Sequence, residues 1–384
     1  MKNNNYQQLT RTFQRLSRFS HLSSIASWDM FTMMPPGGSA ARGEALAEMS
    51  VLQHQILTDK KVGEWLAAAA EEDLNDVEQA NLREMTRHYQ QATLLPESLV
   101  EAKSLAGSRC EHAWRTQRPA NDWQGFSANL KEVVKLSREE AHLRAEAKGC
   151  TPYDALLDIF EPDMTSARLD VLFGDLKSWL PELLAKVVEK QAQRSFVPPQ
   201  GPFPTATQRE LGLEAMKMLG FDFNGGRLDV SAHPFCGGVP EDVRITTRYD
   251  EDELLSALFG VIHETGHARY EQNLPRAWAG QPVALARSTA IHESQSLFFE
   301  MQLGRSEAFL KHLLPAVHAR FGSQAAFSED NFIAWNQHVK PGYIRVDADE
   351  VSYPAHVVLR YEIERALING EIEVDDIPAL WDEK

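Results

Sequence analysis

Two histidines lie four positions apart in the run His263-Glu264-Thr265-Gly266-His267, a spacing that suits metal chemistry. In a helix, residues i and i+4 project from the same face, so both imidazoles could reach one Zn²⁺ at about 2.0–2.1 Å. Glu264 is offset by one residue and would lie beside the ion, where it could take a proton from a zinc-bound water. This is the H-E-x-x-H arrangement. Two surface histidines are the alternative, but the run follows apolar residues of an expected helix and not a polar tract.

A catalytic zinc site needs a third protein ligand and one open position. We predict Glu293 for this role, because it lies on a second expected helix that Ser288 can cap and that could turn back against the first. His292 and Glu300 are the alternatives. His292 should point to another side and could support the ligands from outside, whereas Glu300 lies two turns further along.

Residues outside the ligands matter because they fix the orientation of the imidazoles. Asp347 and Asp349 are candidates to accept the outer imidazole N–H groups, although both could be solvated loop acids. Glu271, one turn beyond His267, is predicted to be a solvated charge.

The elements that must position these residues are mostly helical. Apolar residues at helical spacing predict one helix through Leu9 and Leu16 and a second one through Leu46 and Ile56, separated by a break at Pro35–Gly38. Further amphipathic stretches cover about 77–93, 97–117, 122–148 and 166–193. Pro181 should kink or end the last of these, and residues 196–204 should form an exposed connection.

Two short β-prone runs interrupt the helical pattern at 228–231 and 243–247. Gly237-Gly238 and Pro240 lie between them, so we expect a hairpin. Asp250 followed by Glu253 resembles a capping box that opens the helix carrying the histidine pair.

The composition of the 384 residues is that of a globular protein, with 43% hydrophobic and 24% charged residues. The net charge of −16 argues against a nucleic-acid partner, whose phosphates need a basic surface. Neither a membrane-spanning run nor an apolar secretory leader is expected, so the sequence indicates a cytoplasmic protein. The odd count of three cysteines suits a reducing compartment.

Short motifs spread over nearly the whole chain resemble those of the thermostable metallocarboxypeptidases of the Taq carboxypeptidase type. Each motif is weak alone, but their order is specific. They are Trp28-Asp29 with Met33–Gly38, Tyr153–Leu157 with Glu161-Pro162, His233-Pro234-Phe235, Asp242–Thr246, His263–His267, His292–Gln295 and Ile344–Asp349.

The resemblance implies a mainly α, multi-helix, zincin-like peptidase with a deep groove and a small antiparallel β-element beside the metal. It implies a single domain, residues 1–384, with an N-terminal helical part (1–200) covering the groove and a metal-site part (201–384). It also implies removal of C-terminal amino acids from peptides, a homodimer, and zinc as the metal, with cobalt as a possible substitute. The implied ligands and base coincide with His263, His267, Glu293 and Glu264.

The resemblance also gives roles to residues outside the metal site. Arg345 would bind the free α-carboxylate of the substrate through two charge-assisted hydrogen bonds. The alternative is a salt bridge from Arg345 to Asp347 or Asp349. His233 and Arg244 would shape the site wall or bind substrate.

One motif of the family, Gly-x-x-Gln-Asp-x-His-Trp, does not occur in the sequence, which ends at Lys384. We therefore expect a chain shortened at its C-terminal side, without part of the substrate contacts. Two other interpretations remain open at this stage. One is a zinc endopeptidase that acts on short peptides, and the other is a zinc-binding relic of impaired activity with a peptide-binding or structural role.

Overall fold

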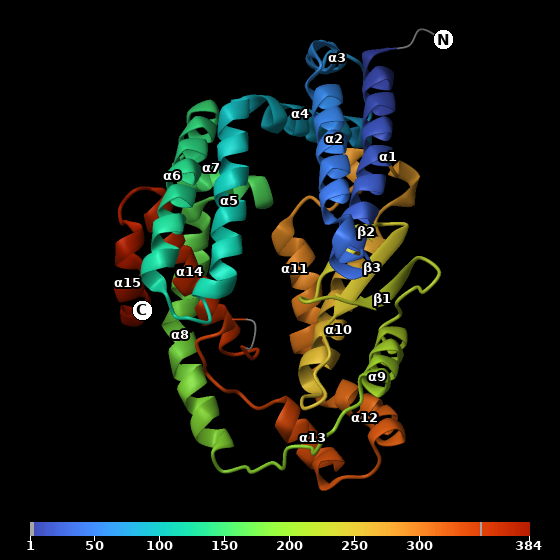
Figure 1. The fold of residues 1–384 in the computed structure, drawn as a ribbon, viewed down its shortest axis with the longest axis vertical. Helices are drawn as coiled ribbons and strands as arrows, with labels where there is room; N and C mark the ends of the chain where they lie inside the picture. Colours follow the sequence, from blue (N-terminus) through green and yellow to red (C-terminus); the bar gives the residue numbers. More distant parts are fainter. Residues whose placement is uncertain (1–3, 346–347) are drawn as a thin grey trace. The chain divides into compact units, whose positions relative to one another are not determined.

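The computed structural model describes residues 4–345 and 348–384, and it is mainly helical with one small sheet (Figure 1). The predicted fold class is therefore confirmed. The chain divides into two compact units, one formed by residues 1–89 with 189–338 and the other by 90–188 with 339–384. Each unit takes segments from both sides of residue 200.

The first unit contains the helices on either side of the sheet. They are α1 (Asn5–Thr32), α2 (Ser39–Thr58), α3 (Lys60–Ala69), most of α4 (Asp76–Leu94), α9 (Thr205–Met218), α10 (Leu255–Gln272), α11 (Thr289–Leu297), α12 (Glu307–Phe321) and α13 (Glu329–Asn336). A π-helical segment, η4 (Phe298–Leu303), continues α11 directly. The second unit is built from α5 (Glu97–Gln117), α6 (Trp123–Lys148), α7 (Pro152–Phe160), most of α8 (Ser166–Gln191), α14 (Tyr353–Ile368) and α15 (Ile377–Glu383).

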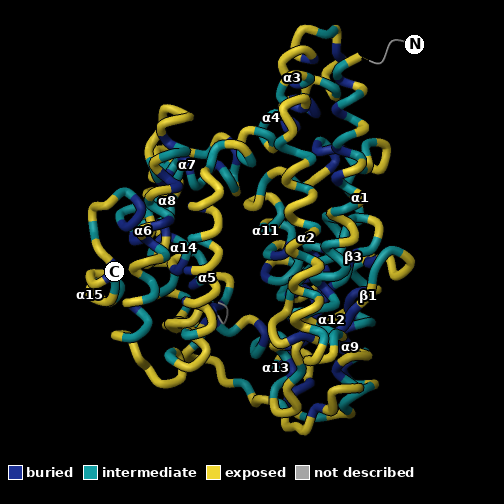
Figure 2. The backbone as a smooth tube through the Cα atoms, turned by 45° about the horizontal axis from the view of Figure 1, so that its top comes forward, coloured by how far each residue is buried: buried dark blue, intermediate teal, exposed yellow. Residues whose placement is uncertain are grey.

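The predicted helical ranges are confirmed to within a few residues, with two differences. First, α8 runs through Pro181 without ending there, which an exposed helix tolerates better than a buried one. Second, α2 has no fully buried residue: Leu46, Met49 and Ile56 are partly buried, and Leu52 is exposed (Figure 2).

The sheet has three strands in the order β1-β3-β2, namely β1 (Gly226–Val230), β3 (Asp242–Thr247) and β2 (Cys236–Val239). The expected hairpin between the first and the last of these runs was wrong, because β1 and β3 pair in parallel. The antiparallel partner of β3 is β2, the glycine-containing segment that the sequence suggested as a connection. The β-element is thus mixed.

The helix α10 is packed on two sides, and this makes it a rigid support. Leu258 and Ile262 belong to a core shared with α9, α12 and α13, whereas Val261 and Ala268 pack with residues of the sheet. Burying a side chain of the size of leucine stabilises the fold by about 1.5–3 kcal/mol relative to its exposure. The apolar side chains of α10 therefore face these two cores, and the polar side chains between them are available for the site.

The start of α10 differs from the expected capping box. The helix begins at Leu255, and the Glu253 carboxylate accepts hydrogen bonds from the backbone N–H groups of Leu255 and Ser256. Asp250 instead accepts a hydrogen bond from the N–H of Asp252.

No helix among the described residues is both long enough and apolar enough to cross a bilayer.

Candidate metal centre

Both histidines of the H-E-x-x-H run lie on α10, and a close approach of two helices places them near α11. A Cβ atom at Gly266 would lie 2.6 Å from both the Gln295 carbonyl oxygen and the Ser296 Cα atom. Only a glycine allows the two backbones to come so close. The helix that carries Glu293 is thereby held against the turn that separates His263 from His267.

Side-chain hydrogen bonds hold the segment between α10 and α11, both at the start of α11 and earlier in the segment. The Ser288 hydroxyl accepts a hydrogen bond from the Ile291 N–H and caps the helix, as predicted. Earlier in the connection, the Val283 N–H donates to the Asn81 side-chain oxygen at 3.1 Å. The Asn81 amide in turn donates to the side-chain oxygen of Gln281. Because Asn81 is fully buried, these bonds tie the segment that precedes α11 to α4.

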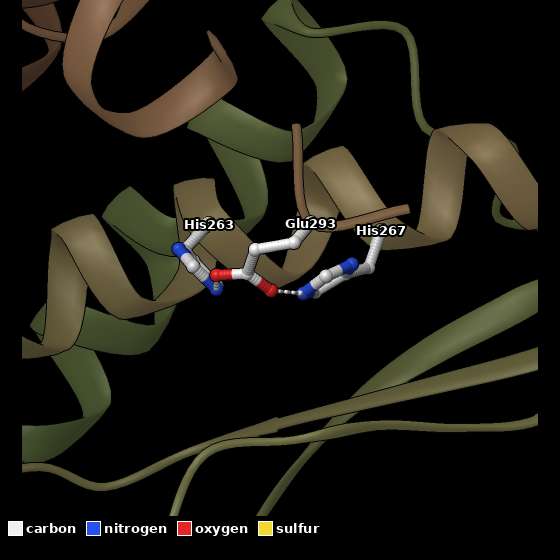
Figure 3. Close-up of side chains that lie close together, drawn as sticks. All are labelled: His263, His267 and Glu293. Carbon is white, nitrogen blue, oxygen red and sulfur yellow. Dashed lines mark ion pairs between the residues drawn. The ribbon is translucent and has the colours of Figure 1, made fainter. Parts of the chain in front are cut away.

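The three predicted ligands come together, with the Glu293 carboxylate between the two imidazole rings (Figure 3). Glu293 Oε2 lies 3.3 Å from His267 Nε2, and Glu293 Oε1 lies 3.8 Å from His263 Nε2. One donor atom from each residue can be chosen so that all three lie within 4.8 Å of one another. A tetrahedral zinc site with bonds of 2.0–2.1 Å separates its donors by about 3.3 Å. Small side-chain movements would therefore bring all three donors into such a shell.

The outer nitrogens of both imidazoles have partners, of which the sequence suggested His292 but not Glu300 or Glu271. His263 Nδ1 lies 2.8 Å from Glu300 Oε2. His267 Nδ1 lies 2.7 Å from His292 Nδ1, and His292 Nε2 lies 2.7 Å from Glu271 Oε1. Both Nε2 atoms are consequently left facing Glu293, as a metal ligand set of two imidazoles and one carboxylate requires.

Glu300 reaches His263 from the π-helical segment η4, in which the Gly304 N–H bonds the Phe299 carbonyl five residues before it. This wider turn changes the direction of side chains after α11 and frequently marks functional sites. Glu271 follows His267 by four residues on α10, and this spacing was the one available signal for its place near the site.

Glu264 is buried beside the histidine pair, with 6% of its surface exposed. Burial raises the pKa of Glu264 to about 7; His263 works against this shift and Glu293 adds to it. For His263, burial works against protonation, but the hydrogen bond and charge of Glu300 outweigh it and raise the pKa of the imidazole. Without a bound cation, burial favours a proton on Glu264, and the hydrogen bond and charge of Glu300 favour one on His263.

Comparison with known proteins identifies the family of this chain. Residues 8–384 match the family described as Carboxypeptidase Taq (M32) metallopeptidase. The chain belongs to the M32 family. Membership in this family of metallopeptidases implies a divalent metal ion and a peptide substrate.

Several M32 proteins resemble the chain over nearly its whole length. Thermostable carboxypeptidase 1 of Thermus thermophilus is 38% identical, with 99% of this chain and 77% of that protein covered. Carboxypeptidase 1 of Bacillus subtilis is 36% identical, with 97% and 74% covered. The structure of Trypanosoma cruzi metallocarboxypeptidase 1 superposes with a TM-score of 0.96 at 50% identity, and the match covers 99% of this chain and 77% of that one.

Two further predicted residues of this M32 chain lie around the sheet. The Arg244 guanidinium donates to both Asp242 oxygens, at 2.9 and 2.7 Å, and lies over the Trp28 ring. His233 is exposed and helps to line a cavity of about 560 Å³ together with Trp28 and Phe235. The Arg244 guanidinium thus already has partners within the chain. Substrate binding by Arg244 or His233 stays a prediction.

Arg345 and Asp349 lie in the second unit. Arg345 donates to the Tyr353 hydroxyl at 2.8 Å. Asp349 accepts hydrogen bonds from the N–H groups of Lys340, Val351 and Ser352, so its carboxylate organises the turn before α14. Its described partners are therefore not imidazoles, in contrast to the predicted role. Asp347 lies outside the described residues.

Proposed function

We propose that this chain is a zinc-dependent carboxypeptidase in which His263, His267 and Glu293 hold the ion. Support comes from one observation above all, the convergence of three ligand atoms beside a buried glutamate in a member of the M32 family. Two imidazoles and one carboxylate are a usual ligand set of catalytic zinc. Cobalt would be accepted as a substitute, and the active form would be a homodimer.

A zinc ion bound there would supply Lewis acidity toward the peptide carbonyl and make a water molecule more acidic. Glu264 is proposed as the general base and acid. Its buried carboxylate accepts a proton from the attacking water and returns it to the nitrogen of the leaving amino acid as the peptide C–N bond breaks. Burial raises the pKa of Glu264 to about 7 in the metal-free site. A bound cation would lower this pKa and so favour the ionised form that accepts the proton.

Preference for the last peptide bond needs a group that binds the free α-carboxylate of the substrate. We assign this role to Arg345, because a guanidinium can bind a carboxylate through two parallel hydrogen bonds. The Tyr353 hydroxyl accepts one N–H of Arg345, and the guanidinium carries further N–H donors that could bind the substrate.

The change Glu264→Gln tests the proposal. It keeps the size of the side chain but removes its ability to carry the proton, so zinc should stay bound at one equivalent while kcat falls about 10²–10⁴-fold. Metal content by elemental analysis and hydrolysis of a short peptide with a free C-terminus are measured together. Glu210→Gln, at an exposed position of α9, is the matched control and should keep both properties. Turnover at the wild-type rate in Glu264→Gln would contradict the assignment.

A further inference from the structure

A chain of polar contacts leads away from one of the two imidazoles of the metal centre. His267 Nδ1 contacts His292 Nδ1 at 2.7 Å, and His292 Nε2 contacts Glu271 Oε1 at 2.7 Å. His267 and Glu271 lie one turn apart on α10, whereas His292 comes from α11. All three side chains are largely shielded from solvent, with exposed fractions between 15% and 23%.

This contact order determines where the protons lie. A carboxylate only accepts hydrogen bonds, so Glu271 requires the proton of a neutral His292 on Nε2. His292 Nδ1 is then an acceptor, and it requires the proton of His267 on Nδ1. The lone pair of His267 is thereby placed on Nε2, the atom that lies 3.3 Å from Glu293.

The opposite arrangement is unfavourable while Glu271 is present as a carboxylate. If His267 carried its proton on Nε2, its Nδ1 would have to accept from His292 Nδ1–H. The unprotonated His292 Nε2 would then face the Glu271 carboxylate at 2.7 Å, with two acceptors in contact and no proton between them. Leaving such groups unpaired typically favours the other tautomer about 5–150-fold.

The second imidazole reaches the same state by a shorter route. Glu300 accepts directly from His263 Nδ1, so the lone pair of His263 also lies on Nε2. The two ligand imidazoles are therefore preset in the same way, one by a carboxylate and the other by a carboxylate acting through an imidazole.

We propose that Glu271 is a positioning residue that acts through His292 to hold His267 in the Nδ1–H tautomer, with Nε2 ready to bind the metal. This inference rests on the proposed function, because it takes His267 as a metal ligand. It gives Glu271 a role in metal affinity although it does not touch the ion.

The first test reads the tautomer itself in metal-free protein. Long-range ¹H–¹⁵N spectra of protein labelled with ¹⁵N-histidine, recorded at pH 8, distinguish the two tautomers of His267. Wild-type protein should show the Nδ1–H form. Glu271→Met removes the acceptor at similar size and should shift His267 toward a mixture with the Nε2–H form. Glu271→Gln keeps one acceptor oxygen and should lie between them. An unchanged His267 tautomer in Glu271→Met would overturn the proposal.

The second test measures zinc affinity by competition with a chromophoric chelator. Loss of an outer partner typically weakens metal binding about 10–100-fold, and this loss is expected for Glu271→Met, with a smaller one for Glu271→Gln. Glu210→Gln should bind zinc like the wild type. Equal affinity of the wild type and Glu271→Met would also overturn the proposal.

Thermal unfolding of the metal-free variants shows whether the fold is kept. Failure of the proposed function has a separate signature. In that case any zinc bound by the wild-type protein would not depend on His263, so His263→Ala would leave the zinc content unchanged. The tautomer spectra would still decide whether Glu271 controls His267.

Discussion

At the scale of single residues, the centre gathers four acidic side chains around three imidazoles, and this composition favours a bound cation. The acids are Glu264, Glu271, Glu293 and Glu300. Like charges held close together in a partly buried place resist ionisation unless a positive charge offsets them. A divalent ion would supply that charge. In the metal-free site, burial is the main cause of the raised pKa of Glu264, and the charges of Glu293 and Glu300 add to it.

The raised pKa of Glu264 predicts how the stability of metal-free protein depends on pH. Because this pKa is about 7 in the folded protein against 4.5 ordinarily, the folded state binds the proton more tightly than the unfolded state. The stabilisation is complete below pH 4.5 and is lost as the pH rises to 7. Between pH 5 and 8, the free energy of unfolding of the wild type should therefore fall relative to Glu264→Gln by about 2–3 kcal/mol.

Urea unfolding of both proteins with a chelator present, at several pH values, measures this difference. A gap between the two proteins that stays constant over this pH range would show that Glu264 is not perturbed.

The inner residues of the site and the outer residue His292 were predictable from the sequence, whereas Glu271 and Glu300 were not predicted as outer partners. His263 and His267 depend only on local helical spacing, and Glu293 required one assumption about a neighbouring helix. The position of Glu300 depends on a π-helical turn, which the spacing of residues does not predict. Glu271 is connected to His267 only through His292, which lies on another helix. Asp349 looked equally suitable by charge, but its local turn uses its oxygens.

At the scale of secondary-structure elements, the distance between α10 and α11 decides whether the ligands meet. Gly266 is the contact point, since its missing side chain is what lets the two backbones approach. A glycine within a helix costs about 1 kcal/mol relative to alanine. Its presence inside the H-E-x-x-H run is thus explained by packing against α11.

Gly266→Ala should therefore push α11 away from the histidine pair. We expect a loss of about 1–3 kcal/mol in the free energy of unfolding, together with weaker zinc binding. Gly260→Ala is the matched control on the same helix, because its new Cβ would meet the nearest atoms at ordinary distances of 3.5 and 3.7 Å. This control should keep wild-type zinc affinity, and its free energy of unfolding should rise by up to about 1 kcal/mol. Unfolding in urea and zinc competition measure both, and similar behaviour of the two variants would contradict this account.

The helices could be predicted because the period of their apolar residues is a local property. Strand pairing is not local, and this is why the sheet differed from expectation. Gly237 and Gly238 looked like a turn, but they form β2 at the edge of the sheet. At Gly238 the backbone φ is 86°, a conformation that glycine adopts easily, so a strand can pass through this position.

At the scale of the whole molecule, the proposed metal centre and the proposed carboxylate-binding residue belong to different compact units. The ligands lie in the unit of residues 1–89 and 189–338, whereas Arg345 lies in the unit of residues 90–188 and 339–384. The two functions can be separated by mutation.

Arg345→Met should lower kcat/KM for a peptide with a free C-terminus about 10–100-fold, the value of charge-assisted hydrogen bonds. The rate for the same peptide with an amidated C-terminus should change little, because its terminus carries no charge to bind. Zinc content should be unaffected. Arg118→Met, at an exposed position of the same unit, is the control and should leave both rates unchanged. An equal loss for both peptides in Arg345→Met would contradict carboxylate recognition by this residue.

Anomalous X-ray diffraction from crystals of the zinc-loaded protein, recorded on both sides of the zinc edge, tests the proposed ligand set directly. We expect one peak at the centre, about 2.0–2.2 Å from His263 Nε2, His267 Nε2 and a Glu293 oxygen. A zinc peak at other residues, or a peak at the two imidazoles with the Glu293 carboxylate outside bonding distance, would contradict it.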